Sequence, residues 1–175
     1  MRDMSASRFR VILHPLSFIP LAATLLVAAC GFQLRGVANL PFESIYVQAG
    51  PRSLLAQEIK RAVRSGSSTR VAEQPDQAEV TLQIISELQE RQILSITGGG
   101  RVAEYQLRYR VLFRLTDAKK REHIPASEIV LSRDYSYQDN TALASESEEA
   151  LLYRNMRSDA VQQLVRRLQG AKLKS

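Results

Sequence analysis

The sequence has few of the residues that cross-link secreted domains or span membranes. Its 175 residues include one cysteine, Cys30, and two histidines. A single cysteine excludes any internal disulfide. The longest apolar stretch, residues 16–29, is 14 residues long. A membrane-spanning helix needs roughly 20 apolar residues, so this stretch is too short to cross a bilayer.

The sequence also lacks catalytic and metal-binding motifs. It has no Gly-x-Ser-x-Gly elbow, no His-Glu-x-x-His pair and no cluster of metal ligands. His123 lies in a lysine-rich segment, 117–125, that we expect to be a solvated loop, and we interpret it as a surface residue. The glycines at 98–100 are not followed by the Gly-Lys-Ser/Thr of a phosphate-binding loop. We therefore predict a protein that is not an enzyme and holds no metal or dissociable cofactor.

The N-terminal region has the three parts of a secretory signal. Arg2, Arg8 and Arg10 precede the apolar stretch, and the small residues Ala28 and Ala29 come directly before Cys30. This junction resembles the lipobox of bacterial lipoproteins. The resemblance implies cleavage before Cys30, N-acyl and S-diacylglycerol groups on Cys30, and, because glycine follows the cysteine, sorting to the outer membrane. An uncleaved membrane anchor is the alternative interpretation.

These features predict the organisation of the chain. Residues 1–29 form the cleaved signal, 30–43 the lipidated N-terminus and an extended tether, 44–170 a single domain, and 171–175 a basic tail. The 146 residues after the signal are enough to bury one core.

The charge of the chain is mildly basic. The net charge is +6, and the signal removes three arginines and one aspartate, which leaves 21 basic and 17 acidic residues. Four arginines are candidates for binding lipopolysaccharide or another anion, because three alternate along one predicted strand and one lies near its start: Arg101, Arg108, Arg110 and Arg114. A solvated sheet face is the competing interpretation. No basic motif with interleaved aromatic residues indicates nucleic-acid binding.

The spacing of apolar residues predicts an α+β domain. We expect a largely antiparallel sheet of four to five strands with a long hairpin, and two helices packed on one face. The predicted order is β-α-β-β-β-β-α, with strands at 44–49, 69–72, 79–97, 102–116 and 127–137, and helices at 52–65 and from Ser145 onward.

Three of these elements carry specific expectations. In the strand at 102–116, apolar residues occupy every odd position from Ala103 to Leu115, which predicts one buried face. The strand before it alternates less cleanly, and we expect a bulge or irregularity near 88–93. Gly66 is predicted to cap the first helix, while Ser145 and Glu148 are spaced as a capping box for a final helix of about 24 residues.

With these elements in order, the chain resembles the family of lipopolysaccharide-assembly lipoproteins LptE, also called rare lipoprotein B. The resemblance rests on four segments: Cys30 to Gly36, Ala103 to Tyr105, Tyr135 to Asn140 and Met156 to Ala160. It implies a non-catalytic plug inside the β-barrel LptD, in a 1:1 complex anchored to the outer membrane, that faces the periplasm, assists barrel assembly and helps deliver lipopolysaccharide to the outer leaflet. Some members carry a basic residue where this chain has Ser145.

Two other functions fit parts of the pattern. An auxiliary lipoprotein of an intermembrane phospholipid transport system would share the anchor and a small α+β body. A cell-wall hydrolase would share the location, but it would need a catalytic constellation that the sequence does not contain.

Overall fold

The structure is a computed structural model, and it describes residues 39–137 and 142–173. The elements in chain order are β1 (Ser44–Gln48), α2 (Leu54–Gly66), β2 (Arg70–Ala72), the short 3-10 turn η2 (Pro75–Gln77), β3 (Val80–Ile96), β4 (Val102–Asp117), β5 (Glu122–Ser136) and α3 (Ala142–Gln169). The predicted β-α-β-β-β-β-α order is therefore confirmed.

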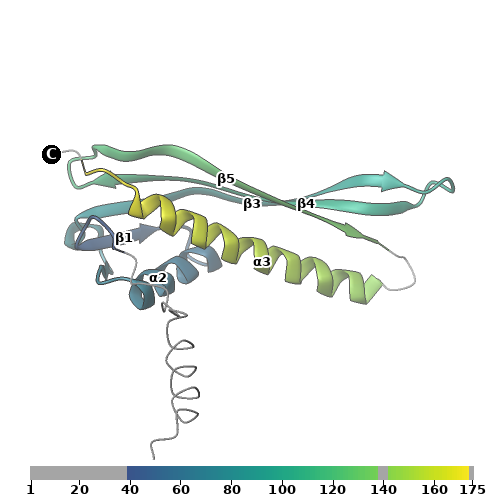
Figure 1. Cartoon of the computed structure of the whole chain (residues 1–175), viewed down its shortest axis with the longest axis horizontal. Coiled ribbons are helices and arrows are strands. Elements are labelled where there is room, and N and C mark those ends of the chain that lie inside the picture. The colour runs from purple at the N-terminus through teal and green to yellow at the C-terminus, as the bar shows by residue number, and fades with distance from the viewer. Residues whose placement is uncertain (1–38, 138–141, 174–175) are drawn as a thin grey trace, which may run out of the picture. The chain divides into compact units, whose positions relative to one another are not determined.

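The strands form one five-stranded sheet in the order β2-β1-β3-β4-β5. The long strands β3, β4 and β5 pair antiparallel, whereas β1 pairs parallel with both β2 and β3. Figure 1 shows α2 and α3 on the same side of this sheet, which confirms the predicted layers. α2 packs on β1, β2 and α3, and α3 packs on β4 and β5. One sheet face is thus covered by helices, and the other we call the helix-free face.

α2 begins where the sequence supplies an N-cap. The Ser53 hydroxyl accepts a hydrogen bond from the backbone N–H of Ala56 at 3.1 Å, satisfying one of the free donors of the first turn. Leu55, Ile59 and Val63 form its buried stripe. The prediction that Gly66 caps the other end is wrong: Gly66 is the last helical residue, and Ser67 caps the helix with both its backbone N–H and its hydroxyl on the Val63 carbonyl.

α3 is longer than predicted, at 28 residues. It begins at Ala142, so the expected capping box at Ser145 and Glu148 is wrong, because both lie inside the helix. The run Ala-Leu-Ala at 142–144 has high helix propensity and extends the element by a turn. Glu146 and Glu149 are consequently past the first turn. Ser145 is buried, with 6% of its surface exposed.

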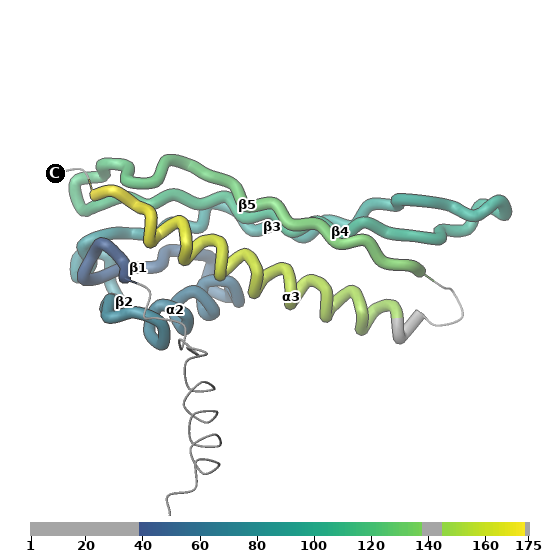
Figure 2. Tube along the Cα trace, in the orientation of Figure 1, coloured from purple at the N-terminus to yellow at the C-terminus, as the bar shows by residue number. Residues whose placement is uncertain are grey.

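The β3–β4 hairpin is the longest feature of the sheet, with strands of 17 and 16 residues. In Figures 1 and 2 it runs past the end of α3 and ends in a free turn. Gly100 takes a positive φ of 77° in that turn, a conformation that glycine adopts at little cost. The register shifts of the β3–β4 pair lie at Ile84/Ser86, Ile93/Ser95 and Ser95/Ile96. The irregularity predicted near 88–93 meets the second of these at Ile93, whereas the shift at Ile84/Ser86 was not predicted.

β5 starts earlier than the sequence suggested. The connection from β4 is a tight turn, with Lys120 N–H donating to the Asp117 carbonyl, and the strand begins at Glu122. Two expectations are therefore corrected. The segment 117–125 is mostly strand rather than loop, and the His123 side chain is buried, with 2% exposed, beside Asp117 at 3.4 Å. Pro125 is tolerated because β5 is an edge strand.

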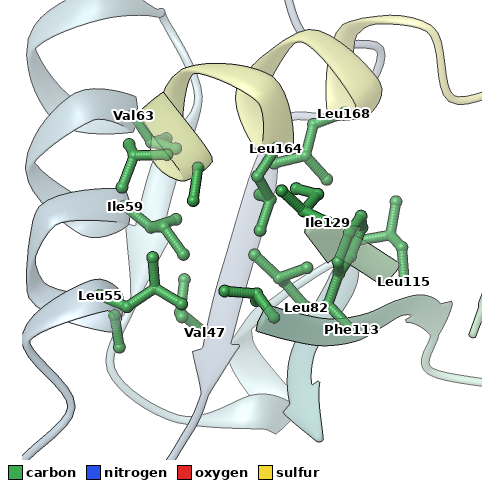
Figure 3. Packing of buried hydrophobic residues seen from close by; sticks show 14 of the residues in the cluster. Val47, Leu55, Ile59, Val63, Leu82, Phe113, Leu115, Ile129, Leu164 and Leu168 are labelled. Atoms are coloured by element: carbon green, nitrogen blue, oxygen red, sulfur yellow. The ribbon is translucent and has the colours of Figure 1, made fainter. Parts of the chain in front are cut away.

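The core lies between the sheet and the two helices. The odd residues of β4 from Leu107 to Leu115 are all 0% exposed, which confirms the predicted buried face. Figure 3 shows Leu82, Phe113 and Leu115 of the sheet facing Leu164 and Leu168 of α3, with Leu55, Ile59 and Val63 of α2 beside them.

The described residues, 39–137 and 142–173, belong to one compact unit. Leu40 and Phe42, at the end of the predicted tether, are 8% and 4% exposed and belong to the core. Cys30 and the predicted signal lie outside the described residues. Within the described ranges, no helix is long and apolar enough to cross a membrane.

Candidate functional site

The structure brings three of the four candidate arginines together. Arg108, Arg110 and Arg114 alternate along β4 with its buried odd residues, so they lie on the helix-free face of the sheet. Arg101 lies in the hairpin turn instead. Seven residues of extended strand separate it from Arg108, about 24 Å at 3.4 Å per residue. Arg101 is therefore not part of the same cluster.

Two of the clustered arginines are neutralised by carboxylates from neighbouring strands. Arg110 contacts Glu128 of β5 at 2.7 Å and Glu90 of β3 at 4.0 Å. Arg114 lies 3.7 Å from Glu122 of β5, and its Nε donates to the amide oxygen of Gln83 at 2.7 Å. Their side chains are 40% and 42% exposed, so these are surface pairs that contribute little to stability.

Arg108 differs from its two neighbours. Its Nε donates to the amide oxygen of Gln106 at 3.1 Å, a neutral partner, and it makes no ion pair within the described part of the chain. Glu90 of β3 is the cross-strand partner of Arg108, but among the described residues no carboxylate lies within ion-pair distance of the Arg108 guanidinium, whereas Arg110 and Arg114 are each paired with an acid. An anion approaching this face would meet Arg108 without displacing an existing carboxylate.

A polar cluster on the helix-covered face was not predicted. The Glu87 carboxylate accepts hydrogen bonds from the Tyr109 hydroxyl at 2.6 Å and from the Ser53 hydroxyl at 2.9 Å. Burial and the neighbouring Glu87 charge both raise the pKa of Tyr109. Nearby, Arg157 of α3 pairs with Glu58 of α2 at 2.7 Å, with only 13% and 26% of the two side chains exposed. These contacts fix the two helices and β3 relative to one another.

A second unpredicted cluster joins the distal half of the hairpin to α3. The Glu149 carboxylate accepts from Arg91 and from the Tyr135 hydroxyl, both at 2.9 Å. Burial, with the Glu149 hydrogen bond, raises the pKa of Tyr135 to about 12, and the Glu149 hydrogen bond raises the pKa of Arg91. The Tyr153 hydroxyl donates to the Glu90 carbonyl at 2.8 Å. Beside this cluster is an open groove of about 480 Å³ between β3 and α3.

One bulge explains why the sequence did not reveal these clusters. Ile84 pairs with Phe113, but Ser86 pairs with Leu112, so Ile85 is an extra residue on β3. Beyond it the two faces of the strand exchange. Glu87 and Arg91 turn toward the helices, whereas Leu88, which the even phase predicted to be buried, is 47% exposed. The irregular alternation was the available signal, but it did not give the position of the bulge.

Among the described residues, no three His, Cys, Asp or Glu side chains are arranged to hold a metal ion. His123 and Asp117 instead lie at the β4–β5 turn, where the Asp117 carboxylate accepts from the Arg121 backbone N–H at 2.9 Å and from Arg121 Nε at 2.7 Å. These contacts close the turn between β4 and β5.

Comparison with known proteins gives a consistent result at three levels. Residues 42–168 match the family model described as "LptE: Lipopolysaccharide-assembly". The LPS-assembly lipoprotein LptE of Yersinia pestis (strain Pestoides F) is 33% identical over 160 residues, covering 83% of this chain and 71% of that protein.

Solved structures extend the match to the fold. The solution structure of an uncharacterized lipoprotein B from Nitrosomonas europaea has a TM-score of 0.70 at 36% identity, covering 79% of this chain and 90% of that one. The crystal structure of the rare lipoprotein B from Shewanella oneidensis has a TM-score of 0.64 at 25% identity, covering 73% of this chain and 94% of that one.

Proposed function

This chain belongs to the lipopolysaccharide-assembly family LptE, and from that membership we propose that it seats in an LptD-like outer-membrane β-barrel, assists assembly of that barrel and helps deliver lipopolysaccharide to the outer leaflet. Family membership itself gives the coarser role: a membrane-associated lipoprotein that takes part in lipopolysaccharide assembly. The barrel partner, the 1:1 complex and the delivery step are the proposed part.

The single observation that carries the proposal is the family match over residues 42–168, which spans every residue of the buried core except Leu40 and Ala171. The structure supports it through shape. A domain that works as a wedge needs stiffness rather than a reactive group. In this one the 17-residue hairpin strand β3 is joined to the 28-residue helix α3 by the part-buried hydrogen bond from the Tyr153 hydroxyl to the Glu90 carbonyl and by the surface ion pair of Arg91 with Glu149. A non-catalytic role suits this construction.

Attachment to the outer membrane is proposed to depend on Cys30. An N-acyl and an S-diacylglycerol group there would supply several acyl chains, and two or more chains hold a protein stably to a bilayer whereas one does not. Gly31 after the cysteine favours outer-membrane sorting in the lipoprotein class that the sequence resembles. The body would then face the periplasm and the barrel lumen.

Within this function, we expect Arg108 to be the strongest anion contact of the helix-free face. The Arg108→Gln variant should bind lipopolysaccharide roughly 10- to 150-fold more weakly, because one charge-assisted hydrogen bond contributes about 1.5–3 kcal/mol. Arg110→Gln is the matched control and should have a smaller effect, since Glu128 already neutralises Arg110. Binding of purified lipopolysaccharide is measured for both variants, and equal affinity of Arg108→Gln and the parent chain would remove this site.

Affinity purification of the tagged full-length protein from membranes tests the function as a whole. Recovery of a large outer-membrane β-barrel in equal amount supports the proposal. Recovery of the periplasmic substrate-binding chains of a phospholipid transporter, with no barrel, would instead assign the protein to intermembrane phospholipid transport. Cleavage of peptidoglycan by the purified protein would contradict the non-catalytic role.

A further inference from the structure

The long free edge of the sheet is the outer side of β5. β5 has 15 residues and lies at one end of the strand order, whereas β2, at the other end, has three. A long edge strand offers a row of backbone donors and acceptors to any extended chain, so it is a site for strand addition and aggregation. The hydrogen bonds made at this edge therefore decide whether a further strand can add to the sheet.

The β4–β5 register identifies the backbone groups that lie on this edge. The Tyr137 N–H donates to the Ala103 carbonyl at 2.8 Å, and the register runs without a shift between positions 136 and 127 of β5. In an antiparallel pair, alternate residues direct both of their backbone groups toward the partner strand. The odd-numbered residues of β5 in this range therefore bond to β4. The even-numbered residues direct their backbone groups outward: Glu128, Val130, Ser132 and Asp134.

Two of these outward carbonyls already accept hydrogen bonds from arginine side chains. Nη1 of Arg167, on α3, donates to the Glu128 carbonyl at 3.1 Å. Nη1 of Arg133, on β5 itself, donates to the Ser132 carbonyl at 2.8 Å. The two carbonyls lie on either side of Val130 along the strand. An added strand would have to displace both guanidinium groups before its own N–H groups could reach these acceptors.

Each of the two arginines is held in place by a second contact. The guanidinium carbon of Arg167 lies 5.6 Å from the centre of the Phe113 ring, a cation–π distance. Nη2 of Arg133 pairs with the Asp159 carboxylate of α3 at 2.8 Å. Both arginines thus connect α3 to the sheet, so the packing of α3 fixes where their guanidinium groups lie along the edge.

A second copy of the chain is the strand that this edge would otherwise accept. Two β5 strands that pair antiparallel about Val130 place this residue opposite its own copy and Ile129 opposite Leu131. Glu128 then lies opposite Ser132, and no like charges face each other between positions 126 and 134. Val130 is 52% exposed and therefore free to make such a contact. An apolar centre without like-charge pairs is a favourable cross-strand arrangement.

We propose that Arg133 and Arg167 close the outer edge of β5 to strand addition and thereby keep the chain from pairing with a second copy of itself. This goes beyond the proposed function, since the closure requires neither a barrel nor lipopolysaccharide. In the proposed complex, the same closure would also prevent β5 from pairing with strands of the barrel.

Disulfide cross-linking tests the closure directly. Residues that form a hydrogen-bonded antiparallel pair have Cα atoms about 5.5 Å apart, a separation that a disulfide spans. Val130→Cys should therefore cross-link two copies wherever two β5 strands pair about this residue. The full-length Val130→Cys protein is extracted from membranes in mild detergent, oxidised and separated on a non-reducing gel. With both arginines present, we expect it to remain monomeric.

Removal of the two arginines should open the edge. Arg133→Met with Arg167→Met keeps unbranched side chains but removes the donors to both carbonyls. In this background we expect the disulfide-linked fraction of Val130→Cys to rise about tenfold, because the two hydrogen bonds no longer compete with strand pairing. Arg154→Met with Arg166→Met is the matched control. These two exposed arginines of α3 give the same charge change, and within the described residues neither bonds to β5, so the fraction should stay at the parent level.

Equal cross-linking in the Arg133/Arg167 and Arg154/Arg166 backgrounds would overturn the proposal. It would also be overturned if Val130→Cys cross-linked fully with both arginines present, because the edge would then be open. Leu151→Cys, on an exposed position of α3, controls for random collision, and a yield equal to that of Val130→Cys would likewise contradict pairing through β5.

Circular dichroism verifies that each variant is folded, and Arg167→Met alone replaces the double variant if the latter does not fold. None of these outcomes alters the co-purification test of the proposed function, so the two proposals fail separately.

Discussion

Asp117 ends β4 and closes the turn to β5. Its carboxylate accepts from the backbone and the guanidinium of Arg121 and lies beside the buried His123 ring. Burial of the carboxyl opposes its ionisation, but the hydrogen bonds and charge of Arg121 outweigh it and hold the pKa of Asp117 at about 2, below its ordinary 3.8. Lys120 takes a positive φ of 61° in the same turn, a conformation that this network supports.

The lowered pKa of Asp117 predicts an acid dependence of stability. A group with a depressed folded-state pKa stabilises the protein above its unfolded value, here 3.8, and loses that contribution as the pH falls through about 2. The Asp117→Asn variant should therefore be less stable than the parent at neutral pH and converge with it as the pH approaches 2. Urea unfolding across this range measures the effect. Asp76→Asn, on the exposed η2 turn, is the control, and parallel curves for Asp117→Asn and parent would contradict the assignment.

The two strands of the hairpin differ in how well their sequences predict which residues are buried. The alternation of β4 correctly predicted a buried face, because from Leu107 to Leu115 the extra residues at its register shifts lie on β3 and β5, so β4 keeps one phase there. β3 changed phase at Ile85, which exchanged Glu87 and Leu88 between the faces. A bulge is set by the pairing of two strands, so one strand's sequence does not position it.

The ion-pair partners of the candidate arginines could not be predicted from the sequence either, because they too depend on how the strands pair. Three arginines were expected on one face and lie there, but their carboxylate partners come from β3 and β5. Those pairings depend on register between strands that are distant in sequence. His123 was similarly misjudged, because the composition of its neighbours indicated a loop whereas the tertiary structure extends β5 through it.

Packing of α3 predicts a contrast between two leucines of that helix. Leu164 is 0% exposed against the sheet and α2, whereas Leu151 is 50% exposed. Leu164→Ala should lower the free energy of unfolding by about 2–5 kcal/mol, through lost apolar contact and the cavity left behind. Leu151→Ala should change it by no more than about 0.5 kcal/mol. Equilibrium denaturation of both variants checks the packing, and equal values would indicate that α3 does not seat on the sheet as described.

For the whole molecule, the proposed membrane contact is the acylation of Cys30. N-acyl and S-diacylglycerol groups there would supply several acyl chains, and two or more chains hold a protein stably to a bilayer whereas one does not. In the proposed complex the barrel would position the body, and the anchor would hold it at the membrane.

The Cys30→Ala variant separates these two roles. It removes the acylation site but no residue of the core, so the domain should keep the far-ultraviolet circular dichroism spectrum of the parent protein. Retention in the outer-membrane fraction should nevertheless fall, because no acyl chain would remain to hold the protein to the bilayer. Fractionation with quantitative immunoblotting measures the distribution, and the parent chain carrying Leu151→Ala serves as a control for the effect of an unrelated substitution. Full outer-membrane retention of a folded Cys30→Ala protein would contradict the anchor, and would mean that the barrel partner holds the protein to the membrane by itself.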